Sequence, residues 1–192
     1  MNKKIRYILV VLLALFLQAC IPAALVAGTA AGGLIINDNR SVRTMNEDHE
    51  ITFKAQSAIN TNKSLKGQTH ISVATFNHLV LMVGQAPTEE LRNIAASLVE
   101  KVPNVKHIYN EITIGAPISI AARSHDSWIT TKVETALVAQ KGLHSTQIKI
   151  VTENSTVYLL GLVIPSQGNL AAEAASTVPG VVKVVKAFEY LK

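Results

Sequence analysis

The second half of this chain repeats the first, and this internal repeat limits its fold more than any other feature. Residues 48–54, Asp-His-Glu-Ile-Thr-Phe-Lys, return 78 positions later as residues 126–132, Asp-Ser-Trp-Ile-Thr-Thr-Lys. Residues 75–84 match residues 152–161 at a shift of 77. A repeat of this length predicts two copies of one structural unit.

The end of the repeat matches at a slightly different spacing. Val-Pro-Asn-Val at residues 102–105 corresponds to Val-Pro-Gly-Val at residues 178–181, a shift of 76. One-residue slips of this kind are expected when loops differ in length between two copies of the same fold. The sequence therefore predicts two related domains, residues 47–116 and 124–192, joined by a short linker.

Each copy begins with an amphipathic helix. In the first copy Ile51, Ala55 and Ile59 recur at helical spacing, and in the second Ile129, Val133 and Leu137 do the same. Asp126 precedes the second stripe, so we expect it to be the N-cap of that helix.

A hairpin follows each of these helices. Asn77 and Asn154 stand between two apolar runs and are the expected turn residues with positive φ. Gly84 and Gly161 are expected to end the second strand at the same place in both copies, as structural residues at a bulge or a close backbone approach.

A second helix and a final strand complete each copy. The helices are expected to open near Thr88 and Ser166 and to end before Pro103 and Pro179. The order in each copy is then α-β-β-α-β. The fold class is α+β: two tandem units, each with a three-stranded mixed sheet packed on two helices.

The N-terminus has the order of a secretory signal peptide. The cations Lys3, Lys4 and Arg6 accompany an apolar run that ends at Leu17, and small Ala19 precedes the only cysteine, Cys20. We expect residues 1–19 to be removed and residues 20–46 to form a tether. The alternatives are an ordinary signal peptide with a chance cysteine, or a transmembrane helix, for which the run is shorter than the roughly 20 residues required.

Composition argues against several functions. Loss of the three signal-peptide cations leaves 15 Lys and Arg against 13 Asp and Glu, so a nucleic-acid partner is not expected. The six histidines lack metal-ligand spacing, and no second cysteine could complete a zinc site. There is also no nucleophile elbow, Walker A loop or dinucleotide turn. We expect no enzyme activity, cofactor or metal.

The only tryptophan marks a candidate binding face. Trp128 shares one side of its predicted helix with Thr131, Lys132 and Thr135, beside the apolar stripe. An indole among hydroxyl groups with one lysine suits the headgroup layer of a membrane. The alternative is that Trp128 packs against the other domain. The first copy has His49 and Glu50 around this position, so the copies are expected to differ in role.

These features together resemble a known family. The repeated unit resembles the BON domain. The resemblance is strongest in the helix-opening stretch 127–133, the turn segment 151–154 and the paired glycines Gly84 and Gly161. Leu17-Gln18-Ala19-Cys20 resembles the lipobox of bacterial lipoproteins, and two BON copies behind a lipobox resemble the outer-membrane lipoproteins of the YraP, or DolP, type. The chain departs from the family in His78 and Ser155, where glycine often follows the turn Asn.

The resemblance implies a location and a function. Cys20 would carry fatty acyl chains such as palmitate, and Ile21 after it implies the periplasmic face of the outer membrane. The expected function is maintenance of envelope integrity by a non-catalytic module that binds anionic phospholipid through its second domain. The alternative is a scaffold or regulator that docks an envelope protein, such as an outer-membrane assembly factor or a cell-wall hydrolase regulator, through an edge strand or the same helix.

Overall fold

The structure is a computed structural model that describes residues 38–191, which lie in one compact unit. The first copy contains α2 (Val42–Thr61), β1 (His70–Phe76), β2 (Leu79–Ala86), α3 (Glu89–Glu100) and β3 (His107–Ile114). The second contains α4 (Ile120–Ala139), a 3-10 turn η3 (Ser145–Gln147), β4 (Ile148–Glu153), β5 (Thr156–Val163), α5 (Pro165–Ser176) and β6 (Lys183–Tyr190). The α-β-β-α-β order is confirmed in both copies. The predicted signal peptide, Cys20 and the tether up to residue 37 lie outside the described residues.

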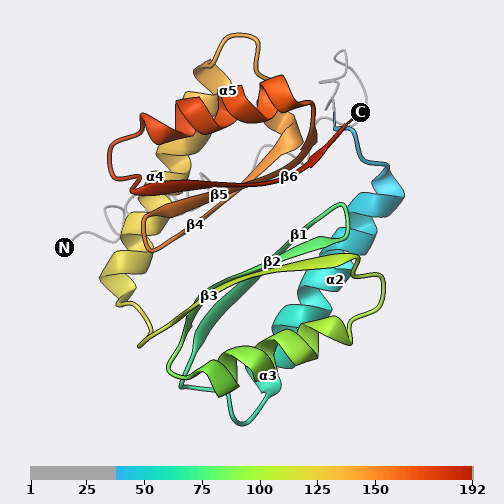
Figure 1. The fold of residues 1–192 in the computed structure, drawn as a ribbon, viewed down its shortest axis with the longest axis vertical. Helices are drawn as coiled ribbons and strands as arrows, with labels where there is room; N and C mark the ends of the chain where they lie inside the picture. The colour runs from blue at the N-terminus through green and yellow to red at the C-terminus, as the bar shows by residue number, and fades with distance from the viewer. Residues whose placement is uncertain (1–37, 192) are drawn as a thin grey trace, which may run out of the picture. The chain divides into compact units, whose positions relative to one another are not determined.

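Both copies form the same three-stranded mixed sheet. β1 runs antiparallel to β2, which pairs in parallel with β3 after the α3 crossover, and β4, β5 and β6 repeat this arrangement. Figure 1 shows that α2 and α3 lie against the first sheet and that α4 and α5 lie against the second. The predicted mixed sheets on two helices are therefore present.

The central strand of each sheet is buried on both faces. In β2, Val80 and Met82 belong to the core that α2 and α3 cover, whereas Leu81 and Val83 belong to a separate apolar cluster. Because side chains alternate along a strand, these two sets point to opposite faces of the sheet. This explains why both central strands are mainly apolar and do not alternate between apolar and polar residues.

The separate cluster joins the two copies. It contains Phe76, Leu81 and Val83 from the first sheet and Tyr158, Leu160 and Ala187 from the second. Two polar contacts add to it: the Gln85 side chain donates to buried Glu153 at 2.7 Å, and Asn77 donates to Glu189 at 2.7 Å. The copies thus pack sheet to sheet, with their helices on the outer faces.

The first helix of each copy begins earlier than predicted. α4 starts at Ile120, after the N-cap Ser119, whose hydroxyl accepts the Ala122 N–H at 3.1 Å. Asp126 is therefore not an N-cap, and residues 120–123, expected in the linker, are helical. α2 likewise begins at Val42, inside the segment expected to be tether. The apolar stripes are as predicted, since Ile51, Ala55, Ile59, Ile129, Val133 and Leu137 are buried.

Asp126 instead caps the neighbouring hairpin turn. It is buried, and its two carboxylate oxygens accept the N–H groups of Asn154 and Ser155, each at 2.8 Å. Both turn residues have positive φ, 47° and 60°. In the first copy Asp48 does the same for Asn77 and His78. The turns lack the favoured Asn-Gly, and the aspartate compensates by binding both of their N–H groups.

The two strand glycines sit where the backbone of a neighbour is close. A Cβ at Gly84 would lie 1.9 Å from the His70 carbonyl oxygen, and one at Gly161 would lie 2.7 Å from that of Gln147. The expectation that they end their strands is wrong, because β2 and β5 each continue for two further residues. Close backbone approach requires glycine at both positions.

Candidate functional site

The outer face of α4 presents the four side chains that the sequence singles out. Trp128 is 55% exposed, and Thr131 and Thr135 are exposed beside it. Their hydroxyl groups donate to the carbonyl oxygens of Ser127 and Thr131, at 3.2 and 2.9 Å. The opposite side of the helix carries the buried stripe. The arrangement leaves the indole in solvent, and Trp128 is not part of the cluster that joins the two sheets.

A lysine is held over the indole. The Lys132 ammonium lies 3.6 Å from the centroid of the Trp128 ring, in cation–π geometry. The same ammonium donates a hydrogen bond to the Pro179 carbonyl oxygen, in the loop that follows α5. Two contacts therefore fix Lys132, and the side chain pairs with no carboxylate among residues 38–191.

His125 belongs to the same face, although the sequence analysis did not include it. Its ring centroid lies 5.7 Å from that of Trp128, with a 34° angle between the rings. Gly180 has φ +102°, and a Cβ there would lie 3.2 Å from the Ile129 side chain and 3.5 Å from the His125 ring. The loop after α5 therefore lies next to the His125 ring, and its positive φ favours glycine at position 180.

Two further apolar residues extend the face along the helix. Ile120 is 77% exposed and Val138 is 74% exposed. One stripe of the helix contains both residues and the face already described, with spacings of three or four and one gap of eight: residues 120, 128, 131, 135 and 138. Sequence reasoning missed Ile120 because it placed the start of the helix at residue 126. Ile120 and Val138 are 18 helical steps apart, about 27 Å along the axis, so the face is an extended surface.

The first copy lacks the tryptophan of this face and pairs the equivalent lysine with a carboxylate. Glu50 occupies the place of Trp128, and Lys54 occupies that of Lys132. Here the lysine pairs with the glutamate at 2.6 Å. On α2 the lysine charge is neutralised by Glu50, whereas on α4 none of the carboxylates among residues 38–191 neutralises Lys132. The two copies therefore differ in the charge of this face.

The described residues show two further general features. Within residues 38–191 no three His, Asp or Glu side chains gather in a way that could hold a metal ion. No helix in this part of the chain is both long enough and apolar enough to cross a bilayer.

Comparison with known proteins gives a consistent family match. The model of the BON domain family matches residues 47–116 and 125–192. Outer membrane lipoprotein DolP of Haemophilus influenzae (strain ATCC 51907 / DSM 11121 / KW20 / Rd) is 36% identical over 177 residues, which are 92% of this chain and 91% of that protein. A 21 kDa hemolysin of Actinobacillus pleuropneumoniae is 37% identical over 155 residues, 81% of this chain and 80% of that one.

Among solved structures, CdsD, a structural protein of the type III secretion system of Chlamydia trachomatis, aligns with 75% of this chain and 63% of its own length. The TM-score is 0.30 and the sequence identity 16%.

Proposed function

Because this chain belongs to the BON-domain family, as a two-domain member of the DolP type, we propose that it is an outer-membrane lipoprotein that binds anionic phospholipid through the outer face of α4. In this proposal the protein is not an enzyme and contributes to envelope integrity by holding its two domains at the membrane surface. Cys20 carries the acyl anchor, and the protein faces the periplasm.

The location rests on the relative and on the N-terminal motif. The DolP relative is named an outer membrane lipoprotein, and the match covers 92% of this chain. Cys20 stands after the apolar run and Ala19, where a lipoprotein is modified. From Cys20 to Asp38 the chain spans 18 residues, which reach at most about 65 Å when extended. An anchored molecule can therefore bring α4 to the same membrane.

One observation carries the lipid proposal: an exposed indole with an unneutralised lysine fixed over its ring. Tryptophan is enriched at the level of the headgroups, where its apolar body and polar N–H are both accommodated. A lysine near an anionic surface contributes about 1 kcal/mol. Ile120 and Val138 add apolar area on the same stripe. The Glu50–Lys54 ion pair argues against the equivalent face of the first copy.

Vesicle binding tests the proposal. The chain lacking residues 1–20 is mixed with phosphatidylglycerol vesicles and with neutral phosphatidylcholine vesicles, and the bound fraction is measured by co-sedimentation. We expect Trp128→Glu to weaken binding to the anionic vesicles by at least about tenfold, a loss of about 1.4 kcal/mol.

The chain offers a matched control. Phe53 is an exposed aromatic residue on α2, 74% exposed, at the position of Thr131 in the other copy. Phe53→Glu introduces the same charge on the corresponding face of the first domain and should leave binding unchanged. Equal binding by the wild type and Trp128→Glu would contradict the proposed site. Equal loss in both variants would indicate a general charge effect.

A further inference from the structure

The two copies differ at one edge of their sheets. β1 and β4 are edge strands, so the backbone groups on their outer sides have no strand partner among residues 38–191. Glu153 and Thr156 flank a two-residue turn, which makes them a hydrogen-bonded pair. Because such pairs alternate along an antiparallel ladder, Ile148 and Ile150 direct their N–H and C=O groups away from β5.

In the first copy the corresponding groups are occupied. The Gln56 side-chain amide on α2 donates to the Ile71 carbonyl at 3.0 Å and accepts the Val73 N–H at 3.0 Å. A primary amide offers the same donor and acceptor as a peptide group, so Gln56 takes the place of a neighbouring strand. Further along, the Thr75 carbonyl accepts from the Lys149 ammonium at 3.2 Å. Side chains therefore hydrogen-bond the outward-facing groups of β1, and we call this arrangement the seal of the edge.

In the second copy the seal is missing. The residue at the position of Gln56 is Glu134, and the partners of Ile71 and Val73 in the repeat are Ile148 and Ile150. An ionised carboxylate accepts but cannot donate, so Glu134 cannot bind the Ile148 carbonyl. The structure shows no side-chain hydrogen bond from Glu134 to either strand residue within the part of the chain it describes.

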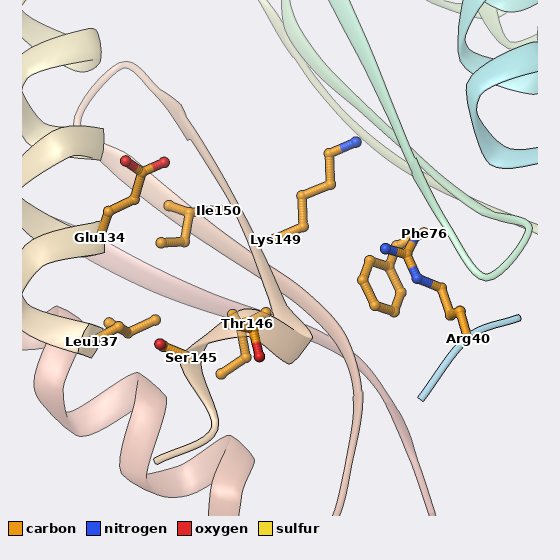
Figure 2. Close-up of a pocket in the computed structure, with 9 residues that line it drawn as sticks. Arg40, Phe76, Glu134, Leu137, Ser145, Thr146, Lys149 and Ile150 are labelled. Carbon is orange, nitrogen blue, oxygen red and sulfur yellow. The ribbon is translucent and has the colours of Figure 1, made fainter. Parts of the chain in front are cut away.

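A cavity lies where the seal would be. Its volume is about 460 Å³, within the range of ligand pockets. Glu134 and Ile150 line one side of it, and Arg40 and Phe76 line the other, as Figure 2 shows. Ser145, Thr146 and Ile148 form the end near η3. The outer edge of β4 therefore faces an open, partly polar space.

We propose that this open edge of β4 binds a short extended peptide segment of a partner protein, which pairs with the Ile148 carbonyl and the Ile150 N–H as an added strand. The occupant has the chemistry that Gln56 supplies in the first copy: an amide N–H beside an amide C=O. Main-chain pairing of this kind is a common mode of peptide recognition.

Charge complementarity indicates which peptide sequences bind. Lys149 lines the cavity, and its ammonium has a backbone carbonyl but no carboxylate partner among the described residues. Burial lowers the pKa of Lys149, and the charge of Arg40 lowers it further against an opposing effect of Asp48. An acidic side chain on the peptide would offset the unfavourable burial of the Lys149 charge. Arg40 is already paired with Asp38 and Asp48, so Lys149 is the cation that gives the site its preference for acidic peptides.

A lipid fits this cavity less well than a peptide does. Acyl chains offer no donor for the Ile148 carbonyl, and the Glu134 carboxylate repels a phosphate. The Trp128 end of the proposed phospholipid face points away from this cavity, because Glu134 is six residues beyond Trp128 and thus about 120° away around the helix. Thr131 and Val138 lie closer to Glu134, so vesicle binding is measured on the Glu134 variant as well. The two sites can therefore be tested separately.

Glu134→Gln provides the test because it supplies the missing seal. In this variant the new amide can donate to Ile148 and accept from Ile150, as Gln56 does in the first copy. We expect the Ile150 amide to exchange with deuterium rapidly in the wild type and at least about tenfold more slowly in the variant. The Val73 amide should be protected in both. Rapid exchange of Val73, or equal protection of Ile150 and Val73 in the wild type, would overturn the inference.

Binding is measured with a defined probe. The full lipidated chain in detergent micelles is used to select from a displayed library of random heptapeptides, and the selected peptides are titrated by fluorescence anisotropy. We expect peptides that contain Asp or Glu, that protect the Ile150 amide and that bind Glu134→Gln about tenfold more weakly. Glu173→Gln, an exposed change of the same charge on α5, should not affect binding. No selected peptide, or equal affinity for wild type and Glu134→Gln, would refute the site.

The outcome is independent of the lipid proposal. Glu134→Gln should retain binding to phosphatidylglycerol vesicles, whereas Trp128→Glu should retain peptide binding. Loss of both activities in Glu134→Gln would show that the variant disturbs α4 as a whole and would count against a separate peptide site.

Discussion

The carboxylate of Asp126 accepts the Ser155 N–H at 2.8 Å, across 29 residues of sequence. Ser155 has φ 60°, a conformation that costs an L-residue about 1–2 kcal/mol. The aspartate therefore holds a turn that the local sequence alone favours weakly. Since the same carboxylate also binds Asn154, one buried side chain joins the first helix of the domain to its hairpin.

Removal of this carboxylate should destabilise the second domain. Asp126→Ala leaves two N–H groups without their charged acceptor, and hydrogen bonds to charged groups are worth about 1.5–3 kcal/mol each. We expect the free energy of unfolding, measured in urea, to fall by about 3 kcal/mol. Ser124→Ala, on the exposed side of the same helix, is the control and should change it by less than about 0.5 kcal/mol.

Glycine in the turn should have the opposite effect. Ser155→Gly relieves the left-handed conformation at the cost of a more flexible unfolded chain, so we expect a gain of about 0.5 kcal/mol. His78→Gly in the first copy should gain less, because the His78 ring also binds Glu47 at 2.9 Å. The two variants are compared by thermal unfolding, and a larger gain at His78 would contradict this account.

The repeat made much of the fold predictable, because apolar periods, Gly and Pro recur at equivalent positions in both copies. The role of Asp126 was not predictable, since an aspartate before an apolar stripe has the same pattern whether it caps a helix or a distant turn. For the site, the sequence identified Trp128 and Lys132 but left exposure and domain packing as alternatives. Ile120 and His125 were missed because the helix start was placed too late, and the contact with Pro179 is set by tertiary structure.

The two strand glycines should tolerate alanine to different degrees. Gly84 has φ +125°, and an added Cβ would lie 1.9 Å from the His70 carbonyl oxygen. At Gly161 the distance to the Gln147 oxygen is 2.7 Å, and φ lies outside the left-handed region. We expect Gly84→Ala to cost about 4 kcal/mol or more of unfolding free energy, and Gly161→Ala about 1–3 kcal/mol. Urea unfolding of both variants checks the order.

The lipid face can be introduced into the first copy. Glu50→Trp removes the partner that neutralises Lys54 at 2.6 Å and places an indole where the second copy has Trp128. We expect binding to phosphatidylglycerol vesicles to strengthen several-fold. Glu50→Gln, which frees Lys54 without adding an indole, should give a smaller increase. If Glu50→Trp leaves binding unchanged, an exposed tryptophan–lysine pair is not sufficient for recognition.

The packing of the two sheets should show a specific response to alkaline pH. Burial of Tyr158 in the cluster between the sheets, with the charges of Glu111 and Glu153, raises the pKa of its phenol to about 12 from 10. A raised pKa favours the protonated form in the folded state. The resulting stability is therefore present below pH 10 and is lost as the pH rises from 10 to 12. We expect the wild type to lose unfolding free energy more steeply than Tyr158→Phe over this interval, measured by urea unfolding at a series of pH values. Parallel curves for the two proteins would show that Tyr158 ionises as freely in the folded state as in the unfolded chain.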